Sequence, residues 1–252
     1  MPITVAHIPN LECEAFYFDM ERRGIVMVPM EPNEVPGALQ RGEVDAGPIS
    51  LLDIDRLTAP VSTISGFCVA SVTRAPACVL LSKAPIDELG GNAIAVNDPD
   101  PTALKLLQVL LTQKHGVNDT TFVGTDDEHD AVFLTGNRGL RGRRAVRGFP
   151  IRLDLGEDWV EWTGLPFVFS RWLVREGMER QDFLVLQDAL FVGQEDWMNN
   201  LYKSTGPRND LLMLPREVLE YVQGMRFFMG VPEDRAIEAF REKLTLLGDT
   251  SH

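Results

Sequence analysis

Small polar residues, glycine and proline follow four predicted strands, at the points where each strand leads into a helix. These segments are Pro9–Cys13, Gly47–Ser50, Asn97–Thr102 and Thr135–Arg138. In open α/β sheets, ligands bind beyond the carboxyl ends of strands, where loops and helix N-termini present backbone N–H groups. Any one segment could be an ordinary helix cap. Together they favour a small-molecule site lined by four strand ends.

Histidines and carboxylates that could do chemistry are scattered rather than gathered in a motif. The sequence contains no GxSxG, P-loop, GxGxxG or HExxH pattern. His115 precedes Gly116 at a predicted helix end, where the dipole favours a cation. His7 ends the first strand and is expected to be half-buried. Asp126–Asp130 is expected to be a solvated acidic turn, because consecutive residues do not converge easily on one ion. We predict no metal site.

One block of charge stands out, and it admits two interpretations. Five arginines lie among glycines and alanines: Arg138, Arg141, Arg143, Arg144 and Arg147. Runs of like charge are usually solvated and mobile, which favours an exposed loop. The alternative is a rim that attracts anions to a nearby site.

The elements that must hold these segments alternate between short apolar runs and amphipathic stretches. We predict strands at 3–7, 25–29, 44–49, 61–64, 67–73, 78–82, 94–96, 121–123, 132–135 and 167–174, and helices at 12–22, 34–41, 51–57, 102–115, 181–202, 215–223 and 233–247. Asn33 and Ser50 are expected N-caps. This alternation indicates the α/β class. Because the pattern restarts after Lys83, two lobes fit it better than one sheet.

Composition narrows the possible partners. The chain has 252 residues, 44% of them hydrophobic, and a net charge of −13, which disfavours nucleic acid. No apolar run approaches the ~20 residues of a transmembrane helix. The N-terminal residues lack a basic and an apolar region, so we expect a cytoplasmic protein without membrane attachment. The three cysteines, without CxxC spacing, also fit a reducing compartment.

Aromatic residues could stack on a ring or fill a core. Trp159, Trp162 and Phe167 run around a predicted helix and into a strand, which favours packing near a hinge. The C-terminal helices, which carry Tyr221 and Phe240, are expected to pack on the first lobe. A homodimer face is possible there.

The segment Leu153–Phe169 resembles the MqnA branch of the MqnA/MqnD family, whose members carry D-L-G-x-x-W-x-x-W-T-G-L-P-F-V-F at the same place in the chain. The resemblance continues at Arg41–Pro48 and Pro85–Leu89, and it covers nearly the whole chain. It implies a periplasmic-binding-protein type II architecture, in which two α/β lobes are joined by two crossover strands. The implied crossovers lie near 78–83 and 167–174.

The same resemblance implies how the lobes divide and what they do. The first lobe would be 1–82 plus 171–252, and the second 83–170. The family's activity is chorismate dehydratase, a hydro-lyase of menaquinone biosynthesis that uses no metal or organic cofactor. The implied partner is a small carboxylate bound between the lobes.

The sequence departs from the family pattern where the ligand would lie. Glu12 occupies the place of an asparagine after Leu11, and Ala77 that of a serine. A family S-R-T-S turn is Asp100–Ala103 here, and a family G-D is Gly136-Asn137. An ionised Glu12 beside a dicarboxylate would repel it, so the resemblance implies either that Glu12 is protonated or a base, or that the ligand differs.

These residues define the expected site. Glu12 is the candidate catalytic base, and the ligand-binding candidates are Asn10, Ser50, Ala77, Asp100, Thr102, Gly136 and Asn137. Thr102 and Asn137 are the expected positioning groups, with Asn10 and Ser50 near the rim. Three hypotheses remain open: a chorismate-dehydratase-like lyase, a non-catalytic protein that binds an amine or hydroxyl at Glu12, and a paralogue acting on another aromatic acid.

Overall fold

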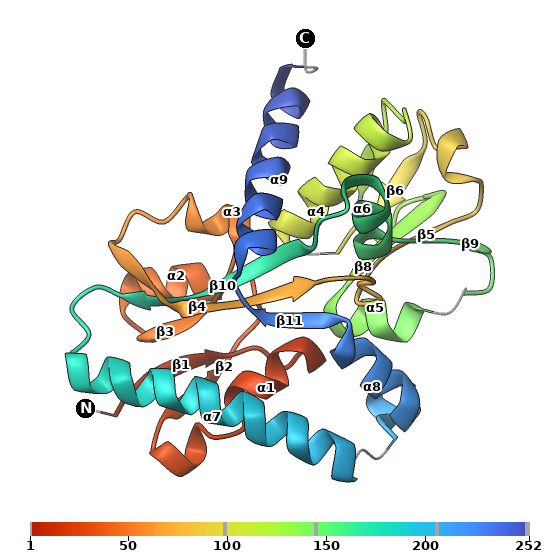
Figure 1. Cartoon of the computed structure of the whole chain (residues 1–252). Helices are drawn as coiled ribbons and strands as arrows, with labels where there is room; N and C mark the ends of the chain where they lie inside the picture. The colour runs from red at the N-terminus through yellow and green to blue at the C-terminus, as the bar shows by residue number, and fades with distance from the viewer. Residues whose placement is uncertain (1, 98–99, 144–145, 205–206, 250–252) are drawn as a thin grey trace.

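The computed structural model describes residues 2–97, 100–143, 146–204 and 207–249 and contains two β-sheets (Figure 1). The first sheet has six strands in the order β11-β4-β10-β3-β1-β2. Their bounds are Thr4–His7 (β1), Val26–Pro29 (β2), Ala46–Ser50 (β3), Val61–Ser71 (β4), Phe167–Arg175 (β10) and Met225–Phe228 (β11). β1 runs parallel to β2 and β3, while β10 runs antiparallel to β3 and β4. We call this sheet and its helices the six-stranded lobe.

The second sheet has five strands in the order β7-β6-β8-β5-β9. They are Cys78–Ser82 (β5), Ala93–Ala95 (β6), Thr121–Val123 (β7), Ala131–Thr135 (β8) and Ile151–Asp154 (β9). The chain enters this five-stranded lobe through residues 72–77 and returns to the first sheet after residue 163. Two sheets in one mixed α/β chain confirm the predicted fold class. The lobe boundaries 1–82 with 171–252, and 83–170, stay a prediction.

Helices cover both sheets. On the six-stranded lobe they are Glu14–Tyr17 (α1), Val35–Arg41 (α2), Leu51–Ile54 (α3), Arg180–Ser204 (α7) and Pro215–Gln223 (α8), and on the five-stranded lobe Pro101–Val109 (α4), Gly136–Gly142 (α5) and Leu155–Thr163 (α6). The last helix, Val231–Asp249 (α9), contacts both β10 and α4. In Figure 1, α7 and α9 lie on opposite sides of the six-stranded sheet. No helix within the described residues is long and apolar enough to cross a membrane.

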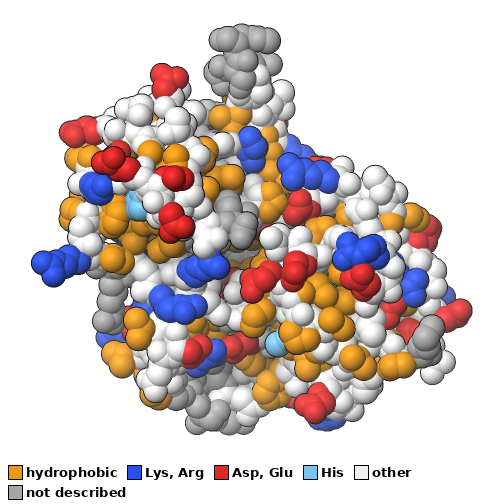
Figure 2. All heavy atoms as spheres, turned by 180° about the vertical axis from the view of Figure 1, so that it is seen from behind, with side chains coloured by type: hydrophobic (Ala, Val, Ile, Leu, Met, Phe, Trp, Pro, Cys, Tyr) orange, Lys and Arg blue, Asp and Glu red, His pale blue; other side chains and the backbone are white. Residues whose placement is uncertain are grey.

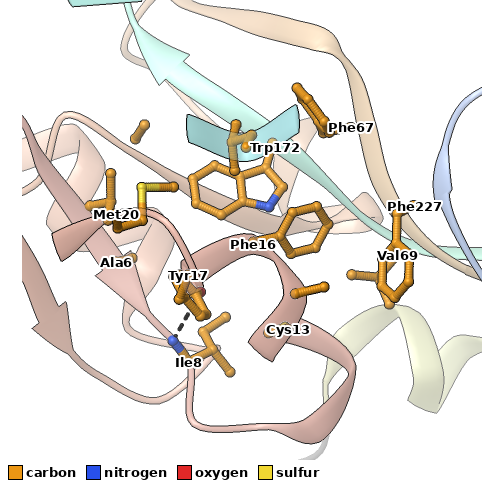
Figure 3. Packing of buried hydrophobic residues seen from close by; sticks show 14 of the residues in the cluster. Ala6, Ile8, Cys13, Phe16, Tyr17, Met20, Phe67, Val69, Trp172 and Phe227 are labelled. Carbon is orange, nitrogen blue, oxygen red and sulfur yellow. Dashed lines mark hydrogen bonds between the residues drawn. The ribbon is translucent and has the colours of Figure 1, made fainter. Parts of the chain in front are cut away.

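Two hydrophobic clusters form the core. In the first, Trp172 of β10 packs with Phe16 and Tyr17 of α1, at ring-centroid distances of 5.4 and 6.1 Å (Figure 3). In the second, Trp159 of α6 packs 5.4 Å from Phe167, and its indole N–H donates to the Pro166 carbonyl at 3.0 Å. Trp159 and Phe167 are therefore core residues, and neither lines the cleft described below.

Several predicted elements were wrong in detail. The helix predicted over 12–22 is a run of short turns, a 3-10 turn at Leu11–Cys13, α1, and another 3-10 turn at Glu21–Arg23. Cysteine and aromatic residues are weak helix formers, so tertiary contacts decide this segment. The strands predicted at 61–64 and 67–73 form the single strand β4, whose register with β10 and β11 is irregular around Gly66 at φ +73°.

Two strands, β9 and β11, were missed. β11 interrupts a region predicted to be entirely helical, and β9 precedes α6. The arginine block is not one solvated loop, because Arg138 and Arg141 lie on α5 and Arg143 is largely buried against Glu217, 2.8 Å away. Arg144 lies outside the described residues. The second cluster also takes Phe240, expected on the first lobe, whereas Tyr221 packs in the first cluster.

Candidate functional site between the lobes

A cleft of about 560 Å³ lies between the two sheets. Its walls are the loops after β1 and β2, the end of β3, the linking segment 72–77, the loop before α4, and the β8–α5 junction. Strand β10 and helix α8 close the back. The four polar segments predicted from the sequence thus all contribute to one cavity, as expected for loops beyond the carboxyl ends of strands.

Glu12 lies on the wall of the cleft that belongs to the six-stranded lobe. The 3-10 turn Leu11–Cys13 buries Leu11 and Cys13 and leaves Glu12 facing the cavity. Its Oε2 accepts a hydrogen bond from the Tyr221 hydroxyl at 3.1 Å. Burial raises the pKa of Glu12, although hydrogen bonds from its own backbone, Tyr221 and Asn10 oppose the shift. A carboxyl with a raised pKa accepts protons more readily than an ordinary one.

Tyr221 was not predicted as a site residue. It lies on α8, far along the chain, and its hydroxyl contacts the Glu12 carboxyl. Burial raises its pKa well above the usual range, so it stays protonated and acts as the donor. The sequence predicted a helix at 215–223 that packs on the first lobe. Nothing local in the sequence indicates that this face meets the first loop.

Asp100 lies on the opposite wall of the cleft, and its carboxylate caps a helix. Its Oδ1 accepts from the Ala103 N–H at 2.9 Å and so caps α4. Burial raises its pKa to about 6, opposed by hydrogen bonds from Ala103, Ser50 and Thr102. The N-terminus of α4, where a ligand carboxylate could have bound, thus already holds a carboxyl group of the protein. Asp98 and Pro99, in the same loop, lie outside the described residues.

Ser50 and Thr102 join the two lobes. The Ser50 Oγ lies 2.6 Å from the Thr102 Oγ1, which also accepts from the Leu52 N–H at 3.0 Å. Ser50 was predicted to cap α3, and this prediction was wrong for its side chain, which makes no capping hydrogen bond. Ser50 lines the cleft, but Thr102 is completely buried behind it. The expected positioning role of Thr102 could be exerted only through Ser50.

Asn137 and Gly136 form a second junction between the lobes. The Asn137 Nδ2 donates to the Pro9 carbonyl at 2.7 Å, and its Oδ1 accepts from the Leu11 N–H at 3.3 Å. Both polar ends of Asn137 thus hold the loop that carries Glu12. Gly136 has φ +57°, and a Cβ there would lie 2.9 Å from the side-chain nitrogen of Asn10. These positions place the β8–α5 turn directly against the first loop.

Ala77 lines the cleft in the linking segment. Its backbone fits against Gly139 of α5, where an added Cβ would lie 2.3 Å from the Ala77 carbonyl oxygen. The lack of a side chain at Gly139 therefore permits this close approach. Elsewhere in the cleft wall, Arg138 and Arg141 of α5 were not predicted as individual site residues.

Among the described residues, the histidines and the predicted cap residue Asn33 show no contact that points to catalysis. His115 Nε2 lies 2.8 Å from an Asp158 carboxylate oxygen, and His7 packs edge-on against Tyr17. Asn33 does not cap α2 with its side chain. Within the described part of the chain, no three His, Cys, Asp or Glu side chains are arranged to hold a metal ion. On the face in Figure 2, basic and acidic side chains are interspersed, with no broad basic area.

A family model described as menaquinone biosynthesis matches residues 3–245. The chain belongs to this family. The match spans both lobes and the cleft, so it agrees with the resemblance carried by Leu153–Phe169.

Several solved structures share the fold of this member of the menaquinone biosynthesis family. Protein AF1704 from Archaeoglobus fulgidus matches with a TM-score of 0.69 and 19% identity over 98% of each chain. A Candida albicans protein described as having the generic periplasmic binding protein fold matches at 0.63 and 12%, over 100% of this chain and 92% of that one. The aliphatic sulphonate binding protein SsuA from Escherichia coli matches at 0.61 and 12%, over 98% and 87%. These similarities confirm the predicted binding-protein fold.

Proposed function

We propose that this protein is a hydro-lyase that dehydrates chorismate, or a cyclic hydroxy acid closely similar to it, with Glu12 as the proton acceptor. The observation that carries the proposal is the Glu12 carboxyl, with its raised pKa, facing a cleft between two lobes in a chain of the menaquinone biosynthesis family. The cleft has the volume of a typical small-metabolite site.

For this reaction the protein needs to orient the substrate and to supply one base. A ring C–H bond and the ring C–O bond of the hydroxyl break, and the C–H electron pair completes an aromatic ring. The proton and the hydroxide leave as water. Much of the driving force is therefore in the substrate. Glu12 takes the ring proton, while the Tyr221 hydroxyl holds its carboxyl in place through Oε2.

Incubation with chorismate tests this proposal. We expect the ultraviolet absorption of the cyclohexadiene to be replaced by that of a benzoate, with loss of one water by mass spectrometry. Chorismate at one hundred times its Kd should also stabilise the protein by about 2.7 kcal/mol in a thermal-shift experiment. The absence of both turnover and a shift would exclude the proposal.

A second function is favoured by one specific observation. Asp100 and Glu12 place two carboxyl groups on the cleft walls, and Asp100 fills the N-terminus of α4. A non-catalytic binding protein, or a paralogue with another aromatic-acid substrate, would use them to hold a ligand hydroxyl or amine. In that case cationic or polyhydroxylated ligands should raise the melting temperature and chorismate should not. Chorismate turnover that appears only in Glu12→Asn would point the same way.

A cytoplasmic location is part of the proposed function. The thiols of Cys13, Cys68 and Cys78 are all free and buried, which fits a reducing compartment. The homodimer expected from the C-terminal helices stays a prediction, to be tested by light scattering.

A further inference from the structure

The cleft contains more acidic groups than basic ones. Glu12, Asp100 and Glu31 lie on its walls, whereas Arg138 and Arg141 are the only cationic side chains among its described lining residues. The whole chain carries a net charge of −13. An anionic ligand that enters this cleft therefore meets a repulsive field that two arginines alone can offset.

Two helix N-termini of the five-stranded lobe already hold a carboxylate. Asp100 caps α4, and Asp154 caps α6 by accepting from the Glu157 N–H at 3.1 Å. Binding proteins can hold carboxylates on helix N-termini without charged side chains, but here both of these ends hold a carboxylate of the protein itself. Positive charge for an anionic ligand is therefore available chiefly from the cationic side chains at the cleft.

Arg138 and Arg141 are arranged for that purpose. They lie three residues apart on α5, on the same face, and both are exposed at the cleft. The Arg141 Nε donates to the Asn137 carbonyl at 3.1 Å, and the Arg138 Nη1 makes only a long contact of 3.4 Å with the Asn97 carbonyl. Neither forms an ion pair with any described residue. By contrast, Arg143 on the same segment is engaged by Glu217.

The junction between the lobes fixes where these arginines stand. Asn137, the residue just before Arg138, bonds the loop that carries Asn10 and Glu12. These hydrogen bonds therefore fix the position of α5 relative to the loop that carries the candidate base Glu12. A guanidinium offers a planar fork of donors that matches a carboxylate.

We infer that Arg138 and Arg141 determine specificity by binding the second carboxylate of a dianionic ligand at the mouth of the cleft. This inference rests on the proposed function, since it names the ligand class of the same site. It accounts for how a dianion binds beside Glu12. It also makes the arginine side chains of α5 the anion-recognition groups of the cleft.

Calorimetric binding of two inert ligands tests the inference. The probes are meta-(carboxymethoxy)benzoate, a dianion, and meta-methoxybenzoate, a monoanion that keeps the benzoate and the ether but lacks the second carboxylate. We expect the wild-type protein to bind the dianion at least about tenfold more tightly, and this preference to disappear in Arg138→Gln/Arg141→Gln, because the second carboxylate then loses its charge-assisted hydrogen bonds. Affinity for the monoanion should change by less than about threefold.

Arg147→Gln is the matched control. Arg147 is exposed and does not line the cleft, so this variant changes the net charge without touching the proposed contact. It should keep the preference for the dianion. Because the two arginines are exposed, the double variant should keep the wild-type melting temperature. The double variant Arg138→Lys/Arg141→Lys should retain part of the preference, since it keeps the charge without the fork.

The outcomes separate this inference from the proposed function. If chorismate is not turned over but the dianion preference appears and depends on the two arginines, the inference stands and the hydro-lyase proposal fails. If chorismate is turned over with an unchanged KM in the double glutamine variant, the inference fails alone. An equal preference in all variants, or no binding of the dianion by the wild type, also overturns the inference.

Discussion

Two carboxyl groups face the same cleft from opposite lobes, and they serve different purposes. Asp100 accepts hydrogen bonds from the first turn of α4 and sits beside the Ser50–Thr102 pair, so the fold uses its oxygens. Glu12 projects from a short 3-10 turn, and the described contacts at its Oε2 come from Tyr221. Burial raises the pKa of both. Both carboxyls also accept hydrogen bonds, so the difference lies in what those bonds do: Asp100 caps α4, whereas the bonds to Glu12 from Tyr221, Asn10 and its own backbone do not cap an α-helix.

The largest effect should follow from removing the Glu12 carboxylate. Glu12→Gln keeps the shape and the contact with Tyr221 but cannot accept a proton. We expect kcat for chorismate to fall by about a hundredfold to ten-thousandfold, the range of a lost general base. Steady-state kinetics measures this. Asp100→Asn is the matched control and should keep most of the turnover; equal losses in both variants would remove the distinction between the two carboxyls.

The Ser50–Thr102 pair beside Asp100 should contribute to the stability of the fold. Thr102→Val removes the hydroxyl that bonds Ser50 and leaves the Leu52 N–H without its acceptor. We expect the free energy of unfolding to fall by about 1–3 kcal/mol, the cost of an unsatisfied buried group. Denaturant titration measures it.

Thr112→Val offers the control for that change. Thr112 lies in the π-helical turn Leu110–Lys114 that continues α4, and its hydroxyl donates to the Gln108 and Val109 carbonyls of α4. Its effect should stay within about 0.5 kcal/mol. If both valine variants cost the same, the Ser50–Thr102 junction contributes nothing special.

Tyr221→Phe should change the pH dependence of activity rather than the fold. The Tyr221 hydroxyl lowers the pKa of Glu12, so its removal should raise that pKa further. Because the base acts when ionised, the rise of kcat with pH should move upward by about one unit, in line with one hydrogen bond to a charge. A pH–rate profile that stays in place would show that Tyr221 does not hold Glu12.

The smallest effect concerns the pH dependence of stability. The pKa of Asp100 is about 6 when folded, above its usual value of 3.8. The folded state therefore keeps the proton longer than the unfolded state. This contribution to stability is complete below the unfolded pKa and is lost as pH rises through the folded one.

Asp100→Asn should flatten the pH dependence of unfolding between about pH 4 and pH 6, because an amide can cap α4 but does not titrate. Thermal melts across that range measure it. Identical pH curves for the variant and the wild type would mean that Asp100 titrates normally.

The comparison also shows how far sequence reasoning reached. The alternation of apolar runs and helices predicted most strands of both sheets, and strand ends with Gly, Pro and polar residues predicted the loops that line the cleft. The sequence-based prediction failed where contacts between distant segments determine the local structure. β11 is short and lies between two segments with helical patterns. The turns after Leu11 pack in the core around Phe16 and Trp172, which determines their shape.

The amino-acid sequence by itself determined the α/β class, the family and the presence of Glu12 and Asp100 beside the ends of strands, because periodicity and local motifs are properties of neighbouring residues. Only the tertiary structure decided which partners each side chain meets. Tyr221 reaches Glu12 from 209 residues away, Thr102 meets Ser50 across the lobes, and Asn137 holds the first loop. The reactivity of a carboxyl depends on its local donors and burial, and here the folding of distant segments against one another supplies both.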